Sequence, residues 1–225
     1  MKQIAAWVFA LLAIAYLLSQ CRKPTGWLGR LVLWMWNSSH SDLTDWGLTR
    51  VSIEKHFAIL DVGCGGGRTI SKLAARAPEG KVCGIDYSKK CVVTSSKKNR
   101  QLIEKGRVEI KHGSVSHLPF PDGMFDLVTA VETHYYWPNL ATDMKEIRRV
   151  LKPGGRLILI VEAYKQRKYD PLNGVMMRLI RATYLSVTEH SQLLTEAGYS
   201  EIAMFEETRK GWLCGIGERP NLPGA

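Results

Sequence analysis

The chain has 225 residues, of which 45% are apolar and 23% charged. This length accommodates one sizeable α/β domain with a hydrophobic core and is short for two. The net charge of +10 suits an anionic partner, either a membrane surface or a nucleic acid, although a generally basic surface gives the same value. Five scattered cysteines form no C-x-x-C pair and no zinc-like pattern with the six histidines. We therefore expect a reducing compartment, with neither a disulfide framework nor a metal site.

An unbroken apolar run occupies Ile4–Leu18. As a helix it would be about 22 Å long, shorter than the ~30 Å hydrocarbon core of a bilayer. We favour a membrane anchor, because Gln3 and Ser19 can extend the helix into the interface. A cleaved signal peptide and a peripheral or buried helix are the alternatives. Arg22 and Lys23 directly follow the run, and the positive-inside rule then places the rest of the chain in the cytoplasm.

The next segment, Trp27–Trp36, has three tryptophans beside basic residues. This is typical of a helix at the headgroup level of a membrane, and it also fits a helix that packs on the following domain. Asn37–Arg50 is mostly polar, and we expect a linker helix that reaches over the ligand site. The sequence thus divides into a hydrophobic anchor helix at 1–23, an amphipathic linker at 24–52 and a globular domain at 53–225.

A glycine-rich stretch follows an apolar run at Phe57–Leu60. It contains an acid, Asp61, and four glycines within positions 63–67, and a segment of helical composition, Thr69–Ala77, comes next. Glycine suits a turn in which the backbone takes a positive φ or lies directly against a ligand. The N-terminus of the following helix offers unpaired N–H groups. The pattern predicts a strand, a tight turn and a helix that together bind a nucleotide-like ligand.

Strand-like and helix-like segments then alternate to the end of the chain. We expect strands at Phe57–Val62, Lys81–Asp86, Arg107–His112, Phe125–Val131, Arg156–Val161, Glu201–Thr208 and Trp212–Gly217. We expect helices at Thr69–Ala77, Ser88–Lys105 with Ser88 as N-cap, Asn139–Leu151, Gly174–Tyr184 and Thr188–Ala197. The order indicates an α/β fold, with a seven-stranded, mostly parallel, doubly wound sheet and a C-terminal antiparallel hairpin, preceded by the N-terminal hydrophobic helix. Four residues lie at or just after the ends of the expected parallel strands: Gly63, Asp86, Ser114 and Glu132. Ligands bind outside the carboxyl ends of such strands, so we expect these residues to line one crevice.

The glycine pattern argues against a diphosphate ligand. A dinucleotide fingerprint requires G-x-G-x-x-G/A, but Arg68 occupies the sixth position, and the chain has no G-x-x-x-x-G-K-[ST] phosphate loop. Four motifs instead follow one another: LDVGCGGG at 60–67, GIDYS at 84–88, HLPFPDGMFDLV at 117–128 and RRVLKPGGRLIL at 148–159. In these motifs the chain resembles the class I S-adenosylmethionine-dependent methyltransferases, particularly the small-molecule branch that includes quinone-biosynthesis enzymes.

The resemblance implies that S-adenosylmethionine is the cofactor. The positions that match cofactor contacts of the family are Asp61, Gly63, Gly65, Gly67, Asp86, Tyr87, Ser114 and Val115. Asp86 would accept hydrogen bonds from both ribose hydroxyls, and Tyr87 would lie against the adenine. Ser114 stands where the family often has an acid, so that contact would be weaker. Alternatively, Asp61 would only stabilise the turn and Asp86 would be a helix N-terminal acid.

Methyl transfer from a sulfonium requires mainly alignment and exclusion of water, and a base only when the acceptor is protonated. The family faces the methyl group with the segment after the fourth strand, here 132–138. His134 is the candidate catalytic base and Glu132 a candidate for orienting the cofactor or substrate; either could instead be structural. The aromatic residues at 135–137 could form the wall of a site for a flat acceptor or belong to the core.

Nucleic acid is disfavoured as the acceptor. The segment after the fourth strand lacks the [DNS]-P-P-[FYW] element of nucleobase amino-methyltransferases, and no cysteine lies near that strand. We therefore expect a membrane-anchored methyltransferase with its catalytic domain in the cytoplasm and a small, lipophilic acceptor. An RNA or protein methyltransferase and a non-catalytic cofactor-binding module are the alternatives. The oligomeric state does not follow from the sequence.

Overall fold

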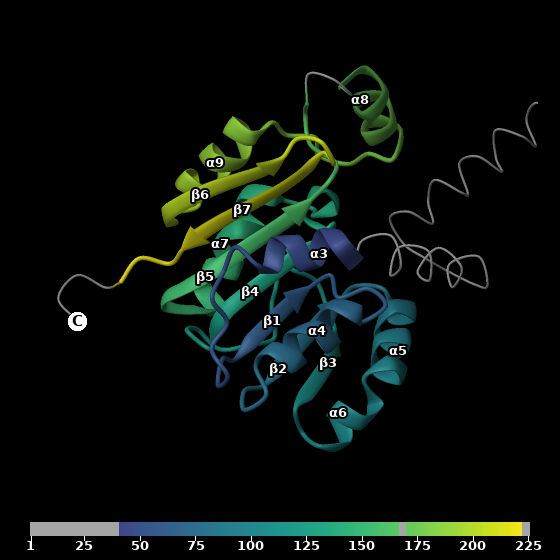
Figure 1. Cartoon of the computed structure of the whole chain (residues 1–225), viewed down its shortest axis with the longest axis vertical. Helices are drawn as coiled ribbons and strands as arrows, with labels where there is room; N and C mark the ends of the chain where they lie inside the picture. Colours follow the sequence, from purple (N-terminus) through teal and green to yellow (C-terminus); the bar gives the residue numbers. More distant parts are fainter. Residues whose placement is uncertain (1–40, 167–169, 222–225) are drawn as a thin grey trace, which may run out of the picture.

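The computed structural model describes residues 41–166 and 170–221 (Figure 1). The apolar run at 4–18 and the tryptophan-rich segment at 27–36 lie outside these residues. Within the described part of the chain, no helix combines the length and the apolar character needed to cross a membrane. The anchor helix therefore stays a prediction.

Seven strands form one sheet in the order β3-β2-β1-β4-β5-β7-β6. They are β1 (Ile59–Val62), β2 (Val82–Asp86), β3 (Val108–His112), β4 (Phe125–Val131), β5 (Leu151–Val161), β6 (Ser200–Glu207) and β7 (Trp212–Glu218). The first five strands pair in parallel, whereas β7 is antiparallel to both β5 and β6. The predicted mostly parallel sheet with its C-terminal antiparallel pair is confirmed.

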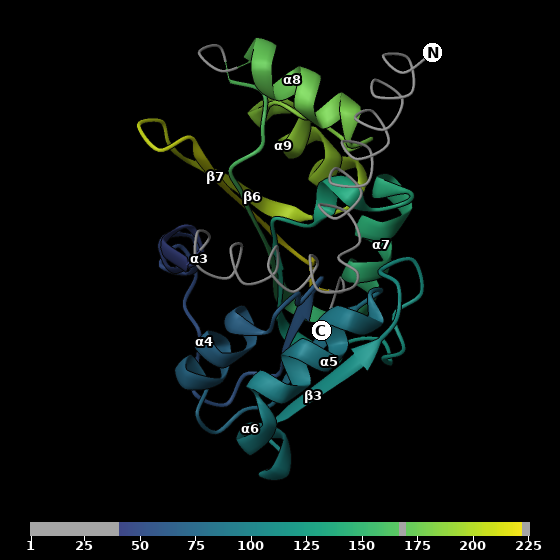
Figure 2. The same ribbon diagram turned by 90° about the vertical axis from the view of Figure 1, so that its right-hand side faces the viewer.

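Helices cover both faces of this sheet (Figures 1 and 2). The helical elements are α3 (Ser41–Leu48), α4 (Arg68–Arg76), α5 (Lys89–Lys98), α6 (Arg100–Glu104), the short 3-10 turn η1 (His134–Tyr136), α7 (Leu140–Val150), α8 (Asp170–Leu179) and α9 (Val187–Glu196). One buried cluster packs α3 and α4 against the sheet, and a second packs α7 and α9 against the other face. The fold is therefore a three-layer α/β arrangement.

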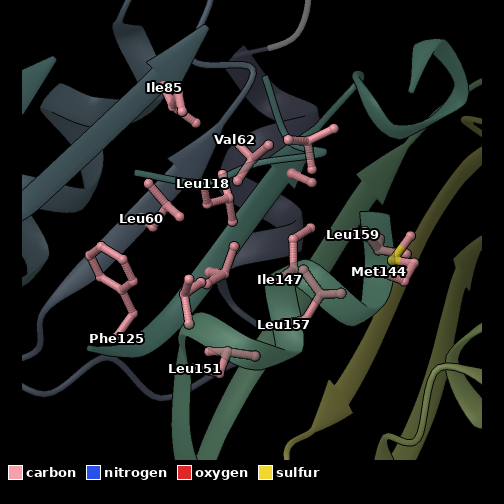
Figure 3. Close-up of a cluster of buried hydrophobic side chains, with 14 of the residues drawn as sticks. Leu60, Val62, Ile85, Leu118, Phe125, Met144, Ile147, Leu151, Leu157 and Leu159 are labelled. Carbon is pink, nitrogen blue, oxygen red and sulfur yellow. The ribbon is translucent and has the colours of Figure 1, made fainter. Parts of the chain in front are cut away.

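The side chains of β5 alternate between the two hydrophobic clusters, one on each face of the sheet. Leu157 and Leu159 belong to the cluster beneath α7, and Figure 3 shows them beside Met144 and Ile147 of that helix. Ile158, between the two leucines, belongs to the cluster beneath α3 and α4. Successive side chains of a strand point to opposite faces, so a continuous apolar run is what a parallel strand buried on both faces requires.

The expected helix at Ser88–Lys105 is interrupted. Asn99 lies between α5 and α6, and its side-chain amide donates hydrogen bonds to the carbonyls of Gly67 and Ser95, each at 3.0 Å. Ser88 does occupy the N-cap position of α5, but its side chain makes no capping hydrogen bond. The expected single helix is thus interrupted at the residue whose side chain hydrogen-bonds to the glycine loop.

Three other boundaries differ from expectation. Leu151 already belongs to β5, so the strand includes the Pro-Gly-Gly turn and α7 ends one residue earlier. Helix α8 begins at Asp170 and ends at Leu179, and Arg181 then takes a left-handed conformation with φ 54°. Helix α3 is part of the core, because Leu43 and Leu48 are buried against the sheet. The folded unit therefore begins before residue 53.

Candidate functional site

A cavity of about 530 Å³ lies at the carboxyl ends of the parallel strands. Its lining comes from the segments that follow β1 to β5 and from helices α3 and α8. The four signals predicted to converge, Gly63, Asp86, Ser114 and Glu132, all line it. Its size is that of a site for a small molecule.

The glycine loop takes a backbone path that other residues would strain. Gly63, Gly65 and Gly67 have φ values of 75°, 50° and 79°. A Cβ on Gly63 would lie 2.2 Å from Oγ1 of Thr133, and one on Gly67 would lie 2.4 Å from Oγ of Ser95. Gly63 and Gly65 line the cavity, whereas Gly67 packs beneath it against α5. The role of Gly67 in this structure is thus to bring the loop close to that helix.

Asp86, the last residue of β2, hydrogen-bonds to the backbone of this loop and to the segment that follows β2. Its Oδ2 accepts the backbone N–H of Gly65 at 2.9 Å and its Oδ1 accepts that of Ser88 at 2.8 Å. Burial raises the pKa of Asp86, while the two backbone hydrogen bonds oppose the shift. The Cys91 thiol also donates a hydrogen bond to this carboxylate, and the remaining acceptor capacity of its two oxygens can receive a hydrogen bond from a ligand. This geometry fits a vicinal diol, such as the ribose of the expected cofactor.

The other predicted contacts lie around Asp86. Tyr87 is exposed at the cavity wall, while Val115 is buried there. The hydroxyl of Ser114 accepts the backbone N–H of Ser116 at 3.2 Å and can still donate one hydrogen bond. At this end of the cavity, Tyr87 therefore offers a flat aromatic ring, Val115 an apolar side chain and Ser114 a weakly polar hydroxyl.

Asp61 is not among the described residues that line the cavity. Its carboxyl is buried within the sheet, where Oδ1 accepts a 2.6 Å hydrogen bond from the Thr129 hydroxyl. Burial raises the pKa of Asp61 to about 7, and the nearby charge of Asp86 adds to the shift. In this arrangement the carboxyl supports the floor of the site, and its direct contact with a cofactor stays a prediction.

His134 is the main correction to the expected site. Its ring is 1% exposed and does not line the cavity, because the 3-10 turn after β4 directs it towards α9. Nε2 lies 2.9 Å from Nε2 of His190, whose Nδ1 lies 2.8 Å from the Ser186 carbonyl. A carbonyl only accepts, so His190 carries a proton on Nδ1, and a neutral His190 then accepts the Nε2–H of His134. Burial lowers the pKa of both rings, most strongly that of His134. Because the His134 ring does not line the cavity, the structure lends no support to the predicted role as a base.

Glu132 lies at the cavity in a conformation unusual for a residue with a side chain, with φ 56°. Its Oε2 accepts the hydroxyl of Tyr135 at 2.7 Å, and its Oε1 accepts the backbone N–H of Glu162 at 2.6 Å. Burial and the nearby Glu132 raise the pKa of Tyr135 well above its usual range, so the phenol stays protonated. Glu132 therefore links the end of β4 to the end of β5.

Glu162 and the α8 residues were missed by the sequence reasoning. Glu162 directly follows β5 and lines the cavity, as the four recognised signals do after their strands. The strand-end rule applied to the fifth strand would have found it. Met176 and Met177 of α8 and Ile180, just after it, also line the cavity; no motif in the sequence indicates that this helix packs beside the site.

The cavity thus has two chemically different halves. The half around Asp86 presents a carboxylate and the bent glycine backbone, and the other presents aromatic and aliphatic side chains beside two glutamates. Burial raises the pKa of the Cys91 thiol to about 12 and that of Cys64 well above its usual value. These lining cysteines are therefore protonated and unsuited to act as nucleophiles. The arrangement suits a reaction in which one ligand is positioned against another.

Comparisons with known proteins give consistent matches. The profile of a family described as "Methyltransferase domain" matches residues 60–159. A demethylmenaquinone methyltransferase of Bacillus licheniformis is 31% identical over 180 residues, which cover 75% of this chain and 76% of the relative. A demethylmenaquinone methyltransferase of Geobacillus sp. is 36% identical over 116 residues, 50% of this chain, and the match spans about half, 48%, of that relative.

The fold also matches solved structures. A SAM-dependent methyltransferase from Aquifex aeolicus superimposes with a TM-score of 0.65, covering 80% of this chain and 92% of that one. The sequence identity is 23%. The likeness therefore concerns the fold, and it agrees with the strand order described above.

Proposed function

The chain belongs to the class I S-adenosylmethionine-dependent methyltransferases, and from that premise we propose that it methylates a small, lipophilic acceptor of the quinol type at a membrane surface. The chain is an enzyme of this class and S-adenosylmethionine is its cofactor, as its relatives and its fold show. The nature of the acceptor is the part that we infer from the site.

The apolar half of the cavity is the observation that carries this proposal. Tyr135, Tyr136 and Trp137 supply aromatic surface, and Met177 and Ile180, which pack in one hydrophobic cluster with the two tyrosines, supply aliphatic surface beside it. Among the described lining residues, Arg68 is the only basic one, and it lies at the glycine loop. A phosphate-rich acceptor such as RNA would require several cations there, whereas a flat apolar ring would be buried favourably.

The relatives support the same class of acceptor. The Bacillus and Geobacillus proteins are named for demethylmenaquinone, a prenylated naphthoquinone. A molecule of this kind resides in membranes, which agrees with the apolar run at 4–18 and with the net charge of +10. We therefore keep the proposal that residues 1–23 anchor the protein to a membrane with the catalytic domain on the cytoplasmic side.

When bound, S-adenosylmethionine supplies an activated methyl group on a sulfonium. Asp86 would hold the ribose diol with the remaining acceptor capacity of its carboxylate, and the bent backbone at Gly63 and Gly65 leaves room for the rest of the cofactor. Tyr87, Ser114 and Val115 would surround its adenine. The acceptor would lie beside Tyr136 and α8, where apolar side chains exclude water from the reacting atoms.

A phenol or carbon acid must lose a proton during this reaction. His134 is directed away from the cavity, which leaves Glu132 and Glu162 as the carboxylates beside its apolar half. Both oxygens of Glu132 accept hydrogen bonds from the protein. We therefore assign Glu132 a positioning role, and Glu162, whose side chain is exposed at the cavity, the role of proton acceptor.

The decisive experiment incubates the purified full-length chain, in mild detergent, with methyl-labelled S-adenosylmethionine and reduced demethylmenaquinone. We expect the label in the organic phase. Parallel reactions with total RNA and with cell protein test the alternatives, and label in either macromolecule would refute the proposed acceptor.

A matched pair of variants tests the apolar half. Ile180→Asn should lower turnover of the quinol about tenfold or more, because it places an amide where the ring would bind. Leu102→Asn changes an equally half-buried aliphatic residue on α6, outside the cavity, and should leave turnover unchanged. Binding of S-adenosylmethionine by calorimetry should be the same in both. Equal turnover by the two variants would contradict the placement of the acceptor.

A further inference from the structure

Helix α8 exposes an apolar face to solvent. Val175, Met176 and Leu179 are 56%, 47% and 59% exposed. They account for three of the five large apolar side chains that are exposed in the described part of the chain. Their spacing of three and four residues places them on one side of the helix. A cluster of this kind on one short helix indicates a contact surface, unlike single apolar residues scattered over a protein.

The same helix forms part of the cavity wall. Met177 is buried and Ile180 is half-buried, and both line the cavity. Met176 contributes to both the cavity wall and the outer face of α8, since it lines the cavity and is also exposed to solvent. The apolar outer face of α8 is therefore continuous with the apolar half of the cavity at Met176.

Positive charges accompany this outer face. Arg178 lies in the last turn of α8, and Arg181 follows the helix in the left-handed conformation that ends it. Both are exposed. Apolar side chains flanked by arginines match the boundary between the acyl chains and the anionic headgroups of a bilayer.

We propose that the outer face of α8 docks on an anionic lipid surface and that the acceptor enters the cavity past Met176. The proposal rests on the lipophilic acceptor inferred above and adds the element that contacts the membrane. Docking by α8 would place the opening of the cavity directly at the lipid, so a water-insoluble ring need not cross the aqueous phase.

The test places an environment-sensitive fluorophore on α8 of the full-length chain. Leu179→Cys is labelled in a Cys21→Ser background, because the other four cysteines are buried. Gln101→Cys, exposed on α6 at the opposite end of the molecule (Figures 1 and 2), is the control. We expect phosphatidylcholine vesicles containing phosphatidylglycerol to shift the emission at position 179 to shorter wavelength and to leave position 101 unchanged. Val175→Cys provides a second label on the same face.

Four results would overturn the proposal. Emission at 179 that is already at short wavelength before vesicles are added would show that another part of the protein covers α8. An equal response at 179 and 101, or none at 179, would show that α8 does not touch lipid. An equal shift with pure phosphatidylcholine vesicles would refute the requirement for anionic lipid.

The arginines are tested in the same assay. Arg178→Gln combined with Arg181→Gln should remove the difference between the two kinds of vesicle, and a difference that persists would exclude these residues as the cause. The measurement needs neither cofactor nor acceptor. It can therefore fail while the proposed reaction is observed, or succeed while the reaction is absent.

Discussion

At the scale of single residues, the site depends on carboxylates whose oxygens already hold the backbone. Asp86 joins Gly65 to Ser88, and Glu132 joins Tyr135 to the end of β5. Such residues shape the cavity before any ligand binds, which is how binding sites avoid the cost of ordering their groups on binding.

Asp86→Asn should weaken binding of S-adenosylmethionine. The amide loses the charge and places an N–H₂ group against one of two backbone donors, so a loss of roughly 1.5–3 kcal/mol is expected, about 10- to 100-fold in Kd. Calorimetry with the cofactor measures this. Glu79→Gln, an exposed acid at the other end of β2, is the control and should bind normally. A folded Asp86→Asn protein with unchanged Kd would contradict the assignment.

Glu162→Gln should lower kcat with reduced demethylmenaquinone by about 10²- to 10⁴-fold, the usual contribution of a general base. Cofactor affinity should not change. Glu162→Asp should restore part of the rate. If Glu162→Gln turns over normally, the proton leaves by another route and the assignment is wrong.

At the scale of elements, contacts between segments that are distant in the chain hold the glycine loop. Asn99 is buried, its side-chain Nδ2 donates to the backbone carbonyls of Gly67 and Ser95, and its side-chain Oδ1 accepts the Ser71 hydroxyl at 2.7 Å. The break between α5 and α6 at this residue therefore fastens α5 to the start of α4.

Asn99→Ala should cost roughly 1–3 kcal/mol in the free energy of unfolding, because it leaves buried hydrogen-bonding groups unpaired. Urea denaturation measures the loss. Gln101→Ala, an exposed change two residues away, should stay within about 0.5 kcal/mol of the wild type. An Asn99→Ala variant as stable as this control would show that the break in the helix is incidental.

At the scale of the whole molecule, the segments after five parallel strands line the cavity, and α3 and α8 complete its lining. Helix α9 is joined to the segment after β4 through the buried His134–His190 pair. The stability of the molecule should therefore respond to the protonation of this pair.

Acidification should destabilise the protein through these two rings. Their pKa values are lowered in the folded state, so below the unfolded value of about 6.5 the unfolded chain binds protons that the folded chain does not. Stability is then lost as the pH falls below about 6.5, by up to about 1.4 kcal/mol per pH unit for each ring. Asp61, with its pKa raised to about 7, contributes the opposite slope between pH 7 and 4.

The measurement is the free energy of unfolding at pH 7.5 and pH 5.5. The wild type should lose stability between these values, and the double variant His134→Gln/His190→Gln should lose less or gain, because the opposing contribution of Asp61 remains. The comparison concerns the pH dependence, so a lower stability of the double variant at both pH values does not affect it. Parallel pH curves for the two proteins would exclude the histidine pair as the cause.

The order of elements, the parallel sheet, the antiparallel end and the cofactor class follow from the sequence alone. Buried parallel strands require apolar runs such as the one in β5, and a ligand-binding turn requires glycines where φ is positive, so both leave a local pattern. Asp86 and Glu132 were recognisable because each lies at or just beyond the end of a strand.

The direction in which a side chain points was decided only by the tertiary structure. His134 and Tyr135 are neighbours in one short turn, yet the first faces α9 and the second faces the cavity. Asn99 and Met176 gained their roles from segments that are distant along the chain. The position of a helix over a site depends on how the whole chain packs, so the local spacing of residues in the sequence does not predict that position.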